Sequence, residues 1–432
     1  MRKSLILAIS LIAVGAFAQA PPAPPAPPAP PAPPAPSAII ADSDQIRFAP
    51  SSQAPALPTR VSPAFECFRD NGNTRQSWHS NSDNDRERWV VSMEGNGCSV
   101  DLRAEGTLTF ANDLSGLTAV SPAGYFEVEE RASGEHRRLE AKPAANGALT
   151  YSYWINGNSH PFDTEAHTWF ASFLLGLDRY SGFAARARVP ELLRQGGPNA
   201  VLSEIQQIHG DYARARYYSV LFDSAKLDGA TVQRVIEQVG RDMSSDYEIG
   251  RVLSMVSMKY ELQDEPSRAA FLNAIDRMKS DYERGRVLAQ LLNRPNLSRE
   301  TLLGAIASTE KMASDYERGR VLSNIAANRV LDPAVVDRYL ESVAGMKSEY
   351  EQGRVYTALL TSSHLSDAQV VKLLASAEHI RSDYELGRVL TVVSSHYSIE
   401  GDIGTAFMHA ARQIRSDYER NRVMAASGRR MM

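Results

Sequence analysis

A tyrosine recurs at a nearly constant spacing through the second half of this 432-residue chain, and no other feature constrains the fold more. Successive copies lie 35, 35 and then 34 residues apart, at Tyr212, Tyr247, Tyr282, Tyr316, Tyr350, Tyr384 and Tyr418. Six of the seven copies belong to a Ser-Asp/Glu-Tyr-Glu tetrad, such as the one that begins at Ser280. Self-similarity at this period is typical of stacked supersecondary units.

Each tetrad has the pattern of a capping box, in which the serine binds the amide three residues on and the glutamate reaches back to the serine's own amide. The acid after the serine faces the positive end of the helix dipole. A second helix start follows in several units, at Asp332-Pro333 and at Ser366, whose partner is Gln369. Residues 210–432 are therefore expected to form an α/α-hairpin solenoid of about seven 34-residue repeats. The length is that of a tetratricopeptide repeat, but the tetratricopeptide residue pattern is absent.

A single hairpin of 34 residues buries too little apolar surface to offset the entropy lost on folding, so the copies are expected to stabilise one another by stacking. Glycine follows the tyrosine by three positions in five copies, although glycine inside a helix costs about 1 kcal/mol relative to alanine. These residues are Gly250, Gly285, Gly319, Gly353 and Gly387. Close helix approach explains their use, and we expect each glycine to face the second helix of its own unit.

Arginine follows the tyrosine by four positions in all seven copies, from Arg216 to Arg422. This offset suggests that the guanidinium stacks on the tyrosine of its own helix. One interpretation is an internal ladder, in which each arginine meets the acidic helix start of an adjacent unit. The other is a row that binds an anionic partner. The candidate binding residues are Arg251, Arg286, Arg320, Arg354 and Arg388.

The first 60 residues have the pattern of an export signal followed by a linker. Arg2 and Lys3 precede an apolar run, and an Ala-x-Ala frame favours cleavage after Ala18. We therefore expect residues 1–18 to be a signal peptide and the mature protein to have no transmembrane span. Residues 21–36 repeat Pro-Pro-Ala, which favours polyproline II, so residues 19–60 are expected to be a disordered linker with a stiff spacer. A ligand for a proline-binding domain is the alternative role of this tract.

Residues 61–162 are expected to form a small β domain, because apolar and polar residues alternate there between turn signals. Examples are Val100 with Leu102 and Phe126 with Val128. The chain has only two cysteines, Cys67 and Cys98, which indicate one disulfide in an oxidising compartment. Residues 163–209 are expected to form a helical connector to the repeats.

The rest of the sequence nominates no catalytic residue, cofactor or metal. The net charge of −4 offers no basic surface for nucleic acid. His160, Asp163, Glu165 and His167 cluster in sequence, but their spacing fits a helix cap better than a metal site. A hydrolase or carbohydrate-active site between the β domain and Trp169 is the alternative to a binding role.

Two resemblances extend these expectations. The 108–130 segment, which contains "TFANDLSGLTAVSPAGYFEVEE", is similar to the β domains of bacterial adhesins. The "SDYE-x-GRVL" units, with "PFDTEAHTWF" and "QGGPNAVLSEI" before them, resemble the extracytoplasmic C-terminal region of BlaR-type bacterial membrane metallopeptidases. The peptidase part is missing, so no catalytic residue carries over. The resemblance implies a module for envelope sensing or interaction. Together with the export signal and the arginine row, it leads us to expect a periplasmic, non-enzymatic binding or scaffold protein for protein–protein interaction or envelope sensing, whose partner is an envelope protein or an anionic envelope component.

Overall fold

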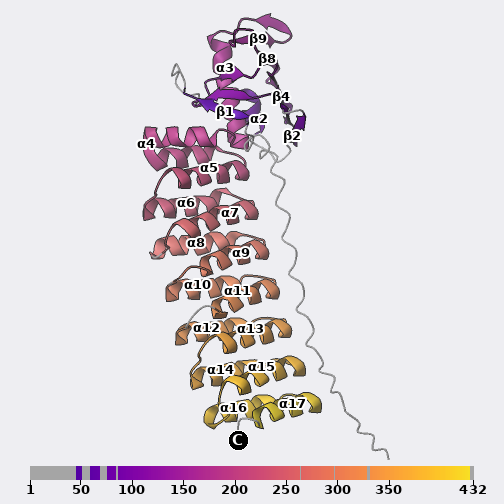
Figure 1. The fold of residues 1–432 in the computed structure, drawn as a ribbon, viewed down its shortest axis with the longest axis vertical. Coiled ribbons are helices and arrows are strands. Elements are labelled where there is room, and N and C mark those ends of the chain that lie inside the picture. Colours follow the sequence, from indigo (N-terminus) through magenta and orange to yellow (C-terminus); the bar gives the residue numbers. More distant parts are fainter. Residues whose placement is uncertain are drawn as a thin grey trace, which may run out of the picture. The chain divides into compact units, whose positions relative to one another are not determined.

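The computed structural model describes residues 45–50, 59–68, 75–83, 86–262, 264–295, 297–327 and 331–428. Two hydrophobic cores organise them, one in a β module and one in a long helical array (Figure 1). A small β domain followed by a helical solenoid is the fold class that the sequence predicts, and it is confirmed. No helix among the described residues has the length and apolarity needed to span a membrane.

The β module contains a seven-stranded antiparallel sheet with the strand order β10-β9-β8-β7-β4-β3-β2. Its strands are β2 (Arg75–Asp83), β3 (Arg86–Gly95), β4 (Cys98–Glu105), β7 (Tyr125–Ala132), β8 (Glu135–Pro143), β9 (Leu149–Ile155) and β10 (Asn158–His160). Strict alternation of side chains gives the sheet one apolar face. On that face the register aligns one row of buried residues across five strands: Val91, Leu102, Val128, Leu139 and Tyr153.

Helix α3 (Thr164–Ser181) covers this face with the apolar residues that recur every three or four positions along it. Trp169, Phe170 and Phe173 belong to the core of the β module. The cap of α3 is Asp163, which accepts hydrogen bonds from the amides of Glu165 and Ala166. The cluster at 160–167 therefore includes a helix cap, as the sequence suggested.

A buried carboxylate joins three segments of the β module. Glu130 on β7 accepts hydrogen bonds from Ser62 Oγ at 2.6 Å and from the amide of Ala64 at 2.7 Å, at the start of α2 (Pro63–Cys67). Its other oxygen accepts from the indole of Trp169. The disulfide between Cys67 and Cys98 then links the end of α2 to the start of β4, as predicted.

A second, three-stranded sheet has the order β1-β5-β6, with β1 (Ile46–Ala49), β5 (Leu108–Ala111) and β6 (Leu117–Val120). Strand β1 pairs parallel to β5, and Phe48 packs against Phe110 and Phe183. The expectation that residues 19–60 form only a disordered linker is therefore wrong for Ile46–Ala49. The predicted signal peptide and the Pro-Pro-Ala tract lie outside the described residues.

The predicted connector divides between the two cores. Helix α3 joins the β module, whereas α4 (Ala185–Gln207) joins the array. Helix α4 is two helical pieces around a kink, because Gly196 and Gly197 have non-helical backbone angles and Pro198 starts the second piece. Both pieces lie within the helical connector that the sequence predicts at residues 163–209.

A buried charged network lies where α3, α4 and α5 (Asp211–Ser224) meet. Asp178 accepts hydrogen bonds from the Tyr217 hydroxyl and from the amide of Ala184. Arg188 lies 3.6 Å from Asp178 and 3.2 Å from Glu204. Burial raises the pKa of the Asp178 carboxyl, although Arg188 opposes the shift. Each buried charge has a partner of opposite sign, so removing one member would leave an uncompensated charge at the junction between α3 and the array.

The array consists of helical hairpins in two layers (Figure 1). The first helices, which start beside the recurrent tyrosines, pack against one another in sequence: α5, α7 (Asp246–Lys259), α9 (Asp281–Leu292), α11 (Asp315–Ala327), α13 (Glu349–Ser362), α15 (Asp383–His396) and α17 (Asp417–Gly428). The second helices form the other layer: α4, α6 (Gly229–Asp242), α8 (Glu265–Arg277), α10 (Arg299–Thr309), α12 (Pro333–Ala344), α14 (Asp367–Ala377) and α16 (Gly401–Arg412). One continuous core runs between the layers.

The predicted starts of the second helices are confirmed at two places. Asp332 caps α12 with Pro333 at the first helical position. Ser366 and Gln369 form a reciprocal capping box at α14. Thus the local capping rules locate these helix starts from sequence alone.

Candidate functional site: the Tyr–Arg strip

The serine of each tetrad is the cap of its helix. At α9, α11, α13 and α15 the serine Oγ accepts a hydrogen bond from the glutamate amide at 3.3 Å. The other half of the predicted box differs, because the serine's own amide is bound by the preceding unit. At Ser280 the acceptor of this amide is Asp246 Oδ2, at 2.6 Å.

The acid after the serine therefore links successive units. Asp281 Oδ2 accepts hydrogen bonds from the amides of Ala313 and Ser314, both at 2.8 Å. Asp315 accepts in the same way from Lys347 and Ser348, at 2.6 Å each. The carboxylate lies at the start of its own helix, as the sequence suggests, and it also holds the turn that starts the next first helix.

The glutamate of the tetrad is almost completely buried and pairs with the arginine three positions later in its own helix. Arg286 lies 2.7 Å from Glu283, and Arg354 lies 2.6 Å from Glu351. The glutamate side chain is only 3% exposed in both pairs, whereas the two arginines are 34% and 29% exposed. Each arginine charge is therefore neutralised within its own helix.

The glycine three positions after the tyrosine makes room for this ion pair from the next unit. A Cβ atom on Gly319 would lie 2.6 Å from Glu351 Oε2 and 2.9 Å from Arg354 Nη2. Gly250, Gly285, Gly353 and Gly387 face the next Glu–Arg pair in the same way. The expectation that each glycine faces the second helix of its own unit is therefore wrong, because the close approach is between successive first helices.

Each of these arginines stacks on the tyrosine of the preceding unit. The guanidinium carbon of Arg320 lies 5.5 Å from the ring centroid of Tyr282, and that of Arg354 lies 5.9 Å from Tyr316. We call this set the Tyr–Arg strip. Its pairs are Tyr212–Arg251, Tyr247–Arg286, Tyr282–Arg320, Tyr316–Arg354, Tyr350–Arg388 and Tyr384–Arg422.

The tyrosine and the glutamate that contact each arginine therefore lie in units opposite to those that the sequence suggested. Stacking was expected within a helix and acid pairing between units, but the stack joins units and the acid pair lies within a helix. All five candidate binding arginines belong to the strip. Arg216 of the first copy is buried instead, with its Nε 3.4 Å from the carbonyl oxygen of Gly182.

Toward the C-terminal ends of the first helices, the positions next to the strip carry no charge from α7 to α15. Two positions per helix, seven and eight residues after the tyrosine, are half-buried. They hold Ser254, Met255, Ala289, Gln290, Ser323, Asn324, Thr357, Ala358, Thr391 and Val392. Between α9 and α11 this surface has a hollow of about 400 Å³, which Tyr282, Arg286 and Arg320 line together with Ala289, Gln290, Asn293 and Asn324.

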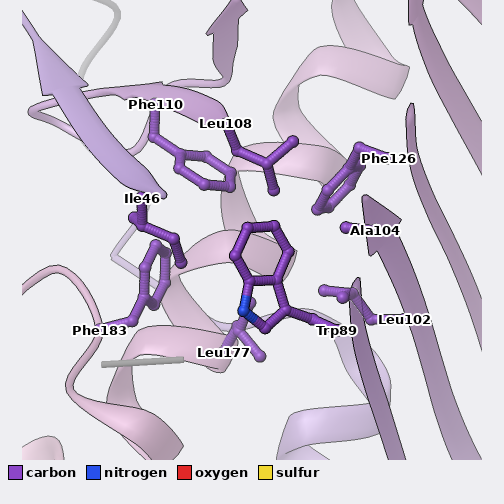
Figure 2. A pocket seen from close by; sticks show the side chains of 9 residues that line it. All are labelled: Ile46, Trp89, Leu102, Ala104, Leu108, Phe110, Phe126, Leu177 and Phe183. Carbon is purple, nitrogen blue, oxygen red and sulfur yellow. The ribbon is translucent and has the colours of Figure 1, made fainter. Parts of the chain in front are cut away.

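A second hollow, in the β module, is too small for a ligand. The indole of Trp89 lies among the apolar residues Ile46, Leu177 and Phe183 (Figure 2). The cavity measures about 10 Å³, and the indole Nε1 has no hydrogen-bond partner within the described part of the chain. A buried water needs at least this volume and two to four polar partners, so this cavity is a packing defect.

The places suggested for metal binding and hydrolysis have other roles among the described residues. No group of three or more potential metal ligands lies together in them. The ring of His167 packs against Phe162 at an interplanar angle of 46°, and partial burial lowers the pKa of this histidine. Trp169 is buried in the core of the β module. A hydrolase site at this boundary stays a prediction.

Comparisons with known proteins add no family to this description: no family model, no curated protein and no solved structure matches the chain.

Proposed function

We propose that this protein is an exported, extracytoplasmic, non-enzymatic binding or scaffold protein that holds a polypeptide partner along the Tyr–Arg strip. The signal-peptide pattern at residues 1–18 supports export, and the Cys67–Cys98 disulfide fits an oxidising compartment. The resemblance of the repeats to the extracytoplasmic region of BlaR-type metallopeptidases points to the cell envelope.

The observation that carries the proposal is the chemistry of the strip. It presents aromatic rings and guanidinium groups in a regular row, beside small and amide side chains. Tyrosine and arginine are the residues that interfaces between proteins favour. An anionic polymer is a poorer fit than a polypeptide, because a buried glutamate neutralises each arginine.

The test is affinity capture from the native envelope with the full mature protein as bait. The variant Ala289→Glu with Asn293→Glu places two charges in the hollow between α9 and α11 without removing a strip residue. The matched control is Ala269→Glu, at an exposed alanine of α8 in the other layer. We expect the double variant to lose the partner and the control to keep it. A partner that the double variant retains, or that the control loses, would contradict the proposal.

A further inference from the structure

The occupant of the strip can be named by chemistry, on the basis of the proposed function. We propose that the Tyr–Arg strip binds a proline-rich segment in the polyproline II conformation, and that the Pro-Pro-Ala tract at residues 21–36 of a second copy is this segment. Aromatic-lined grooves recognise polyproline II segments because these are already extended and lose little entropy on binding.

The first argument is the match between two periods. Polyproline II has three residues per turn and rises about 3.1 Å per residue, so one Pro-Pro-Ala triplet advances about 9 Å and returns to the same face. Packed helices lie about 8–10 Å apart, which is the advance of the strip from one first helix to the next. One triplet therefore corresponds to one Tyr–Arg pair.

The second argument is length. The tract contains five Pro-Pro-Ala triplets followed by one further proline. At about 3.1 Å per residue it extends about 50 Å. Six Tyr–Arg pairs are joined by five steps of about 9 Å, or about 45 Å in all. The tract is thus long enough to pass every pair of the strip.

The third argument is hydrogen bonding. Proline has no amide hydrogen, so the tract offers mainly carbonyl acceptors. The strip supplies the complementary donors: guanidinium groups, tyrosine hydroxyls and the side-chain amides of Gln290, Asn293 and Asn324.

The fourth argument is charge. Residues 21–36 carry no charged side chain. The strip arginines are paired with glutamates that are 1% to 6% exposed at α7 through α15. The positions seven and eight residues after each tyrosine are uncharged. A neutral segment can therefore bind without separating these ion pairs. A second copy is the simplest source of the tract. A tract that bound the strip of its own chain would constrain the path of the chain between Ser37 and Gln45, and a second copy sets no such constraint.

The test uses the mature protein without residues 21–36 and a fluorescent peptide of five Pro-Pro-Ala triplets. The control peptide alternates proline and alanine over the same length, so it extends similarly but lacks the three-residue period. We expect the triplet peptide to bind at least tenfold more tightly than the alternating one. Ala289→Glu with Asn293→Glu should weaken its binding at least tenfold, and Ala269→Glu should leave it unchanged.

Sedimentation velocity of the full mature protein tests the source of the tract. We expect self-association that the deletion of residues 21–36 abolishes. Equal binding of both peptides, or no binding, would overturn the inference. A full chain that stays monomeric yet excludes the peptide would overturn the assignment to a second copy. Strip-dependent capture of an envelope partner without peptide binding would refute this inference alone and leave the proposed function standing.

Discussion

In both helix layers of the solenoid each helix packs against its counterparts in the adjacent units, but the two layers use different residues for these contacts. In the first helices the same residue types return in most units, and the acid, tyrosine, glycine and arginine each contact the next or the preceding copy. In the second helices the links between units vary: Lys372 pairs with Asp337, whereas Arg234 binds Asn199. Both of these pairs are exposed, and exposed pairs contribute little to stability.

This difference shows which positions determine the stacking. Residues of the first helices recur because their geometry must fit an identical neighbour one unit away. Residues of the second helices only need to fill the shared core or face the solvent, so their polar contacts can change from unit to unit. We therefore expect substitutions in the first-helix signature to cost more than matched substitutions in the second layer.

The largest effect is expected at a signature glycine. In Gly353→Leu even the new Cβ would lie 2.5 Å from Glu385 Oε2 and 3.4 Å from Glu385 Cβ, so α15 must shift away from α13. We expect the free energy of unfolding to fall by about 3 kcal/mol, measured by urea denaturation. Gly229→Leu is the control, because its Cβ meets no atom within 4 Å. Similar losses in both variants would remove the distinction between the layers.

The next effect is expected from Arg354→Met. This change removes the stack on Tyr316 and leaves the carboxylate of Glu351 buried without its cation. We expect a loss of about 2 kcal/mol, less than for a fully buried pair because Arg354 is partly exposed. Arg338→Met in α12 breaks ion pairs with Glu310 and Glu341, whose carboxylates are 29% and 67% exposed, and should cost at most about 1 kcal/mol. If the strip did not contribute to stability, Arg354→Met would lower the melting temperature no more than Arg338→Met does.

A smaller loss is expected from Asp281→Ala, which leaves the amides of Ala313 and Ser314 without their acceptor. We expect a cost of about 1.5 kcal/mol and faster hydrogen exchange at these two amides. Asp337→Ala, which removes an exposed pair with Lys372, should cost about 0.5 kcal/mol or less. Unchanged exchange at Ser314 would mean that the aspartate does not hold the turn.

The smallest effect is expected from Glu317→Gln and depends on pH. Burial raises the pKa of Glu317 above its ordinary value of 4.5, and Arg320 opposes this shift without cancelling it. The folded state therefore holds the proton more tightly than the unfolded state. Wild-type stability falls as the pH rises from the unfolded-state pKa through the higher folded-state pKa. Glutamine does not titrate, so the wild type should lose stability relative to the variant as the pH rises above the ordinary pKa of the glutamate. Parallel stability curves would contradict this.

Much of the array follows from sequence because its signals are local and repeated. The serine caps, the cap at Asp332 and the box at Ser366 locate helix starts without any knowledge of tertiary contacts. The contacts of the signature residues are harder to assign. Arg354 is three positions from Glu351 and four from Tyr350, and both spacings place side chains on one helix face. Only the stacking of the helices shows that the ring it covers belongs to Tyr316.

The β module was less predictable for a similar reason. Strand β1 is four residues long and lies in a segment rich in serine, proline and alanine, so its alternation is too short to detect. Its pairing with β5 joins residues more than 60 positions apart. Strand β8 has charged residues at most positions, and burial of Leu139 and Ala141 becomes visible only beside its neighbours.

The most direct test of inter-unit stacking is a double-mutant cycle at one step of the strip. The cycle combines Tyr316→Ala with Arg354→Met and measures the free energy of unfolding of the four proteins. A second cycle pairs Tyr350→Ala with Arg354→Met, on the same helix. Stacking between units predicts a coupling of about 1 kcal/mol in the first cycle and about zero in the second. Coupling in the second cycle alone would contradict it.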